Sequence, residues 1–253
     1  MCTLIALHRC VVGAPLVIAA NRDEFFERPA EGLALRETVG GRIVAPRDVR
    51  AGGTWLGVNL HGVFAALTNR RSVEPDPARR SRGLLVLDAL RARTAAEAAG
   101  ALEDLPIDAY NPFNLLVADG STAHVVSYEG KAARFDLDAG AHVVGNVHPL
   151  DRGSEKLERL RRRAERAADA SEDSLLDALA EVCRDHDGDG AFDAACVHAG
   201  TYGTRSSTLL RLGGAGGGEL RFASGAPCQN PYLDFTALLR ELDSGRVSER
   251  ATT

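Results

Sequence analysis

The sequence predicts an α+β protein in which antiparallel sheets are covered by helices. Short apolar segments rich in β-branched residues recur in runs along the 253-residue chain, and turn residues separate them. Two pairs of segments with helical periodicity interrupt these runs. Runs of strands followed by runs of helices are typical of the α+β class.

The N-terminal third is predicted to consist of strands and loops. Residues 2–8 and 15–21 are expected to form an opening hairpin, which would hold the start of the chain in a sheet. A second strand pair is expected on either side of the turn at His61-Gly62. The segments 25–50 and 70–82 are expected to be loops.

Helices and strands alternate in groups through the rest of the chain. Thr94 with Glu97 three residues later is a capping box at the start of a helix, and Ser171 or Asp173 is expected to cap another. The expected helices are 83–93, 94–104, 153–169, 172–184 and 232–242, and the expected strands are 114–119, 122–128, 133–136, 142–146, 208–212 and 219–222. No linker divides the chain, so a single domain over 1–243 with a mobile tail over 244–253 is expected.

Composition excludes several classes of function. A net charge of −5 and a pI near 5.8 argue against a nucleic-acid-binding protein. No apolar run approaches the roughly 20 residues of a membrane span, and no secretory signal is evident. The five cysteines are scattered and odd in number, which favours a reducing compartment, and a cytoplasmic protein is expected.

No cofactor or metal site is expected. The cysteines form no CxxC pair, and the histidines show no pairing typical of zinc ligands. Residues 185–190 resemble the start of an EF-hand calcium loop, but Cys196 stands at the twelfth position, where a bidentate glutamate is required.

Cys2 is the first candidate catalytic residue. Removal of Met1 would give the cysteine a free α-amine, whose pKa of about 7.7–8.0 makes it a base beside the thiol at neutral pH. Activation of a nucleophile by an N-terminal amine is an established catalytic arrangement. The alternative is a small buried side chain at the start of a strand.

The tetrad Asn21-Arg22-Asp23-Glu24 follows the second expected strand. A carboxylate there could orient the α-ammonium, and a guanidinium could favour the thiolate. If the strand continued, Asn21 and Asp23 would face one side and Arg22 and Glu24 the other. The alternative is a solvated strand end followed by a turn.

Three later polar residues complete the set of candidates. Asn69 and Asn146 close apolar segments, where a side-chain amide could stabilise an oxyanion or simply occupy a turn. Arg205 lies in a polar segment that leads into a strand. It could hold an anionic group of a substrate, or it could be an ordinary surface arginine.

Together these residues carry a resemblance to a known family. The segments Met1-Cys2, Ala20–Glu24, Gly52–Gly57, Ala65–Asn69, Gly145-Asn146 and Tyr202–Thr208 resemble an NRDE-type protein of the Transport and Golgi organization family. That family is similar to N-terminal-nucleophile amidohydrolases of the choloylglycine hydrolase and penicillin V acylase group. The adjacency of Arg22 and Asp23 departs from those hydrolases, in which two residues separate the arginine from the aspartate.

The resemblance implies a four-layer αββα sandwich and a hydrolase, or acyltransferase, that acts on a non-peptide linear amide through a thioester. It implies that the catalytic set is Cys2, Arg22, Asp23, Asn69, Asn146 and Arg205, and that Asn21 and Trp55 bind substrate. The expected partner is a small amide or acyl molecule. Whether the chain forms a homo-oligomer is left open. The alternative is a non-catalytic binding or trafficking protein that handles haem or acyl lipids, in which His8 and Cys10 are conceivable haem ligands.

Overall fold

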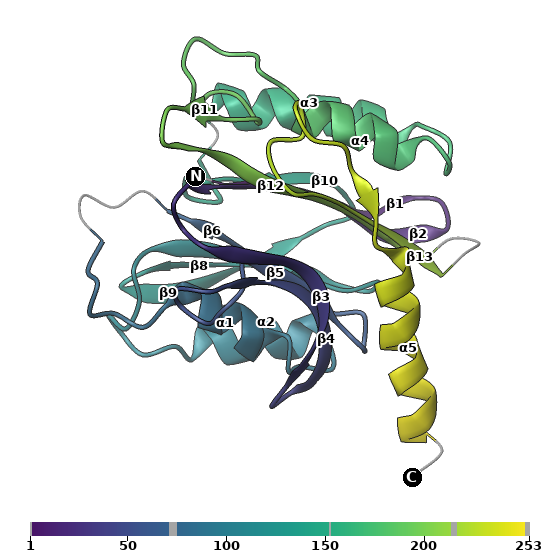
Figure 1. Ribbon diagram of the computed structural model, residues 1–253. Coiled ribbons are helices and arrows are strands. Elements are labelled where there is room, and N and C mark those ends of the chain that lie inside the picture. Colours follow the sequence, from purple (N-terminus) through teal and green to yellow (C-terminus); the bar gives the residue numbers. More distant parts are fainter. Residues whose placement is uncertain (1, 71–74, 152, 214–216, 251–253) are drawn as a thin grey trace. The chain divides into compact units, whose positions relative to one another are not determined.

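The computed structural model describes residues 2–70, 75–151, 153–213 and 217–250. Its contacts divide the chain into two compact units, one of 1–28 with 138–235 and one of 29–137 with 236–253. Each unit is built on one antiparallel sheet (Figure 1). None of its helices in the described ranges is long and apolar enough to cross a membrane.

The first unit holds a sheet with the strand order β10-β1-β2-β12-β13-β14, and β11 pairs with β12. The strands are β1 (Cys2–Val11), β2 (Ala14–Phe25), β10 (Gly140–Val144), β11 (His198–Ala199), β12 (Tyr202–Leu212), β13 (Gly218–Ala223) and β14 (Leu233–Asp234). The expected opening hairpin is thus confirmed.

Two helices, α3 (Glu155–Ala168) and α4 (Leu175–Cys183), cover one face of this sheet (Figure 1). Ile5 and Ala19, opposite each other on β1 and β2, pack against the buried residues of both helices. Because side chains alternate along a strand, the odd-numbered residues of β1 face the helices here, and the even-numbered residues point away.

The second unit holds a sheet with the order β3-β4-β5-β6-β7-β8-β9. Its strands are β3 (Ala30–Thr38), β4 (Gly41–Asp48), β5 (Leu56–Asn59), β6 (Phe64–Asn69), β7 (Phe113–Ala118), β8 (Ala123–Glu129) and β9 (Lys131–Leu137). Its helices are α1 (Arg82–Ala89), α2 (Ala95–Glu103) and α5 (Thr236–Arg250). Thr94 caps α2 as expected, since its Oγ1 accepts a hydrogen bond from the Glu97 N–H at 3.1 Å.

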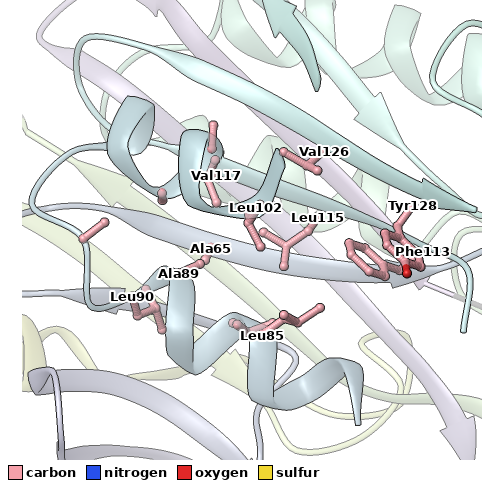
Figure 2. Packing of buried hydrophobic residues seen from close by; sticks show 14 of the residues in the cluster. Ala65, Leu85, Ala89, Leu90, Leu102, Phe113, Leu115, Val117, Val126 and Tyr128 are labelled. Carbon is pink, nitrogen blue, oxygen red and sulfur yellow. The ribbon is translucent and has the colours of Figure 1, made fainter. Parts of the chain in front are cut away.

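The core of the second unit lies between its sheet and helices α1 and α2 (Figure 2). Phe113 and Tyr128, on paired strands, stack with ring centroids 5.3 Å apart. The Tyr128 hydroxyl donates to the Pro106 carbonyl at 2.5 Å, so this buried aromatic also satisfies its polar atom.

Several expectations differ from the structure. The prediction of a loop over residues 25–50 is wrong for most of that segment, because β3 and β4 form a hairpin there. Helix α4 is capped at Ser174, whose side chain makes no capping bond, rather than at Ser171 or Asp173. Helix α5 continues through Arg250, beyond the expected boundary at 243, and residues 251–253 of the expected tail lie outside the described ranges.

Candidate active site

The register of β1 and β2 decides which residues share a face with Cys2. Cys2 lies directly opposite Arg22, and Thr3 opposite Asn21. Directly opposed residues of an antiparallel pair point to the same side. Cys2 and Arg22 therefore share the face that points away from α3 and α4, and Asn21 and Asp23 share the helix-covered face.

The tetrad is not the strand end that the sequence suggested. Pairing with β1 ends at Arg22, but β2 continues to Phe25 because β12 pairs along its other edge as far as Tyr202, which satisfies backbone groups on that edge. Asn21, Arg22 and Asp23 are consequently buried. The alternation predicted for a continuing strand is confirmed by the Arg22–Glu24 contact of 4.0 Å on one face.

Asn21 links the strand to the segments behind it. Its Nδ2 donates to the carbonyl oxygens of Cys183 at 2.8 Å and Ala195 at 2.9 Å. Its Oδ1 accepts a hydrogen bond from the Ser207 hydroxyl at 2.6 Å. These bonds fix the end of α4 and the segment before β11 against β2.

Asp23 is a buried carboxyl with one hydrogen bond in the described part of the chain. Its Oδ1 accepts from the Thr204 hydroxyl at 2.7 Å, and no donor in that part reaches its Oδ2. Burial raises the pKa of Asp23 to about 7, although the Thr204 hydrogen bond and the charge of Lys156 oppose the shift. Near neutral pH, this group can therefore accept or release a proton.

Thr204 connects Asp23 to the segment before β11. Its Oγ1 accepts a hydrogen bond from the Val197 N–H at 2.8 Å while its hydroxyl proton goes to Asp23. Gly203 permits this approach, because a Cβ at that position would lie 2.5 Å from the Val197 carbonyl oxygen. The backbone carbonyl of Asp23 also accepts from the Tyr202 hydroxyl at 2.9 Å.

Cys2 has a hydrogen-bonded nitrogen and a thiol whose pKa is raised. The Cys2 nitrogen, an amide while Met1 is present and the α-amine once Met1 is removed, lies 3.3 Å from Asn146 Oδ1 and donates to it. Burial raises the pKa of the thiol, the Asp23 carboxylate raises it further, and Arg22 acts in the opposite direction. Such a thiol needs an adjacent base to become a nucleophile.

Arg205 supports the backbone at the end of β2. Its Nη1 donates to the carbonyl oxygens of Phe25, Phe26 and Arg28, at 3.0, 2.5 and 2.9 Å. It is the extra residue of a bulge, because Thr204 pairs with Asp23 while Ser206 pairs with Arg22.

The first unit thus contains six of the eight predicted site residues: Cys2, Asn21, Arg22, Asp23, Asn146 and Arg205. Asn69 and Trp55 belong to the second unit. Asn69 is the last residue of β6, opposite Phe113, and the Trp55 carbonyl accepts from the Leu67 N–H at 2.9 Å. Their roles remain predictions.

Lys156 was missed by the sequence-based reasoning. Its amine on α3 donates to the Phe192 carbonyl at 3.2 Å. Burial lowers the pKa of Lys156, and the negative charges of Asp23 and Cys2 oppose this shift. One signal was available, since Lys131 and Lys156 are the only lysines among 30 basic residues. A lysine presents a compact ammonium group, in contrast to the planar guanidinium of the arginines that dominate this chain.

Replacing Thr204 with valine is expected to raise the pKa of Asp23 further, because the hydrogen bond that stabilises the carboxylate is lost. Titration of the aspartate carboxyl carbons by NMR measures this shift. Thr204→Ser is the matched control, since it keeps the hydroxyl, and the Asp23 pKa should stay at its wild-type value. An equal shift in both variants would contradict the assigned role of the hydroxyl.

Comparison with known proteins places the chain in a family. The family model described as Transport and Golgi organisation 2 matches residues 1–222. The chain belongs to this family. Human Transport and Golgi organization protein 2 homolog is 32% identical over 226 residues, which cover 77% of this chain and 81% of that protein. The mouse homolog is 29% identical over 232 residues, with the same coverage.

Solved structures identify the fold of this member of the Transport and Golgi organisation 2 family. The C2A mutant of conjugated bile acid hydrolase from Clostridium perfringens has a TM-score of 0.59 at 14% identity, over 96% of this chain and 94% of that chain. The Caenorhabditis elegans N-acylethanolamine-hydrolyzing acid amidase ortholog has a TM-score of 0.51 at 14% identity, over 82% and 91%. The chain therefore shares the fold of these two solved structures.

Proposed function

We propose that this protein is an N-terminal-nucleophile hydrolase, or acyltransferase, that cleaves a non-peptide linear amide through a thioester on Cys2. The observation that carries the proposal is the hydrogen bond of the Cys2 nitrogen to Asn146 Oδ1, beside a desolvated thiol and a buried Asp23. Removal of Met1 turns that nitrogen into the base that the thiol needs. The proposed location is the cytoplasm, where thiols stay reduced.

Three groups in the first unit, from Cys2, Asn146 and Asp23, act in the steps of the proposed reaction. The α-amine takes the thiol proton, the sulfur attacks the substrate carbonyl, and the resulting α-ammonium protonates the leaving nitrogen as the carbon–nitrogen bond breaks. Water, or a second amine, then releases the acyl group from the thioester. Asn146 orients the amine, and the Asp23 carboxylate stabilises the ammonium form.

We infer the substrate class from the two structural relatives. Their names specify one hydrolase of N-acylethanolamines and one of conjugated bile acids, and we propose an N-acyl amide substrate for this chain. Oxyanion stabilisation by Asn69, and substrate contacts by Trp55, are proposed from the resemblance alone.

The rival proposal is a binding or trafficking protein on the same scaffold that handles haem or an acyl lipid. The names of the family and of its mammalian members specify transport and Golgi organisation, which favours this candidate. His8 is buried and Cys10 is exposed on β1. A carrier does not require a free α-amine at Cys2, and this difference separates the two candidates.

Intact mass after incubation with a cysteine-directed acylating probe tests the hydrolase. We expect loss of Met1 and rapid labelling of Cys2 alone, since the other four cysteines lack a neighbouring α-amine. Cys10, which is exposed on the same strand, is the internal reference for ordinary thiol reactivity. Retention of Met1, or labelling of Cys2 no faster than Cys10, would favour the carrier.

A further inference from the structure

Four potential metal ligands, from three separate segments of the chain, lie close together in the first unit. His186 follows α4, Cys196 and His198 flank the start of β11, and Cys228 lies in the segment after β13. One ligand atom from each side chain lies within 4.8 Å of all the others. None of these residues belongs to the proposed catalytic set.

The separations among three of these ligand atoms are close to those around a tetrahedral zinc ion. The Cys196 and Cys228 sulfurs are 3.5 Å apart. His198 Nε2 lies 3.2 Å from the Cys228 sulfur and 3.6 Å from the Cys196 sulfur. Zinc bonds of about 2.3 Å to sulfur and 2.0–2.1 Å to nitrogen place tetrahedral ligand atoms roughly 3.3–3.8 Å apart.

A disulfide explains this cluster less well. The sulfur separation of 3.5 Å exceeds the bonded distance of about 2.05 Å. A disulfide would also give no reason for two imidazoles to converge on the same point. The rings of His186 and His198 stack with centroids 5.3 Å apart, so both histidines approach the cysteines from neighbouring positions.

We propose that His186, Cys196, His198 and Cys228 bind one Zn²⁺ ion in a closed Cys₂His₂ site. Two thiols release their protons to solvent on binding, and two neutral imidazoles complete the shell. Two thiolates balance the charge of the ion. Four protein ligands leave no open position, so the site is structural and the zinc ion takes no part in the chemical steps of the proposed hydrolysis.

The ligand spacing explains why the sequence predicted no metal. Cys196 and His198 are the two ligands closest in sequence, and one residue between a cysteine and a histidine matches no common zinc spacing. Cys228 comes thirty residues after His198. In the EF-hand-like segment, the Asp185 carboxylate forms ion pairs with Arg159 at 3.2 Å and Arg163 at 2.6 Å. These arginines already neutralise a carboxylate that calcium would require.

The zinc site would stiffen the support of Asp23. Val197, between two of the ligands, donates its N–H to Thr204, which in turn donates to Asp23. The Ala195 carbonyl, next to the ligand Cys196, accepts from Asn21. Zinc would therefore hold in place the segment that binds the helix-covered side of β2.

Metal analysis of the full chain tests the proposal. After purification in reductant and removal of loose metal, we expect about one zinc per chain, and cobalt substitution should give the intense visible bands of a tetrahedral thiolate site. The double variant Cys196→Ser/Cys228→Ser should lose at least about tenfold in bound zinc, and Cys10→Ser, at an exposed cysteine of the same unit, should retain it.

A second variant keeps the test decisive if the double variant fails to fold. His186 is exposed, so His186→Ala should fold and bind zinc more weakly, and zinc should raise its Tm less than that of the wild type. Zinc bound equally by all variants would show an adventitious ion only and overturn the proposal. A Cys196–Cys228 disulfide in the protein, or no zinc uptake by the reduced chain, would overturn it as well.

Discussion

Replacing Cys2 with alanine is expected to reduce turnover of an N-acyl amide by about 10³-fold or more, because the sulfur that forms the thioester is lost. Alanine is also small enough for removal of Met1, so the variant keeps the α-amine and its hydrogen bond to Asn146. The substitution therefore isolates the nucleophile. Release of the free acid from a panel of N-acyl amides measures the effect.

Two further variants complete this experiment. Cys10→Ser changes an exposed cysteine on the same strand and should leave turnover unchanged. Cys2→Ser keeps a weaker nucleophile beside the same amine, and its turnover should fall between those of the wild type and the alanine variant. Full turnover by Cys2→Ala would refute the hydrolase proposal and favour the carrier.

Local patterns in the sequence predicted the elements that carry Cys2. The opening hairpin was predictable because apolar residues of β1 and β2 are close in sequence and separated by a short turn. Thr94 likewise predicted the start of α2 through a bond to a residue three positions away. The hairpin β3–β4 was missed because much of it is only partly buried, which leaves little hydrophobic periodicity to detect.

The tetrad shows where local reasoning fails. Polar residues at 21–24 suggested a solvated strand end, yet Asn21 and Asp23 are buried because partners distant in sequence supply their hydrogen bonds. Asn21 reaches the Cys183 carbonyl, and Asp23 reaches Thr204. Such partners are defined only once β12 has paired with β2, so no window of sequence contains them.

Because Arg22 and Asp23 are adjacent, the sequence alone did not show which of the two faces Cys2. Pairing of Cys2 with Arg22 gives these two residues a common face, while Asp23 acts on the thiol through its charge and backbone. The four-layer stacking of the two units remains a prediction of the resemblance, and the oligomeric state remains open.

Replacing Asp23 with asparagine is expected to remove a pH-dependent loss of stability. In the unfolded chain the carboxyl loses its proton near pH 3.8, whereas in the folded protein its pKa is about 7. The folded state therefore binds more protons between these values, and its stability falls as pH rises through this window. The loss is complete above about pH 7 and amounts to roughly 4 kcal/mol, at about 1.4 kcal/mol per pH unit.

Urea unfolding of both proteins between pH 4.5 and 8.5 measures this difference. The stability of Asp23→Asn relative to the wild type should increase by roughly 3–4 kcal/mol across the range, whatever constant offset the new amide introduces. Asp173→Asn makes the same change at an exposed position and serves as the matched control. A relative stability that does not vary with pH would contradict the raised pKa of Asp23.

The Asp23→Asn variant also tests the link between stability and function. If Asp23 stabilises the α-ammonium, Asp23→Asn should gain stability at pH 8 and lose turnover at the same pH. A buried carboxylate that costs free energy of folding is expected where the charge is needed for chemistry. If Asp23→Asn is both more stable and fully active, then Asp23 has no part in the reaction. This conclusion would hold even if Cys2 is the nucleophile.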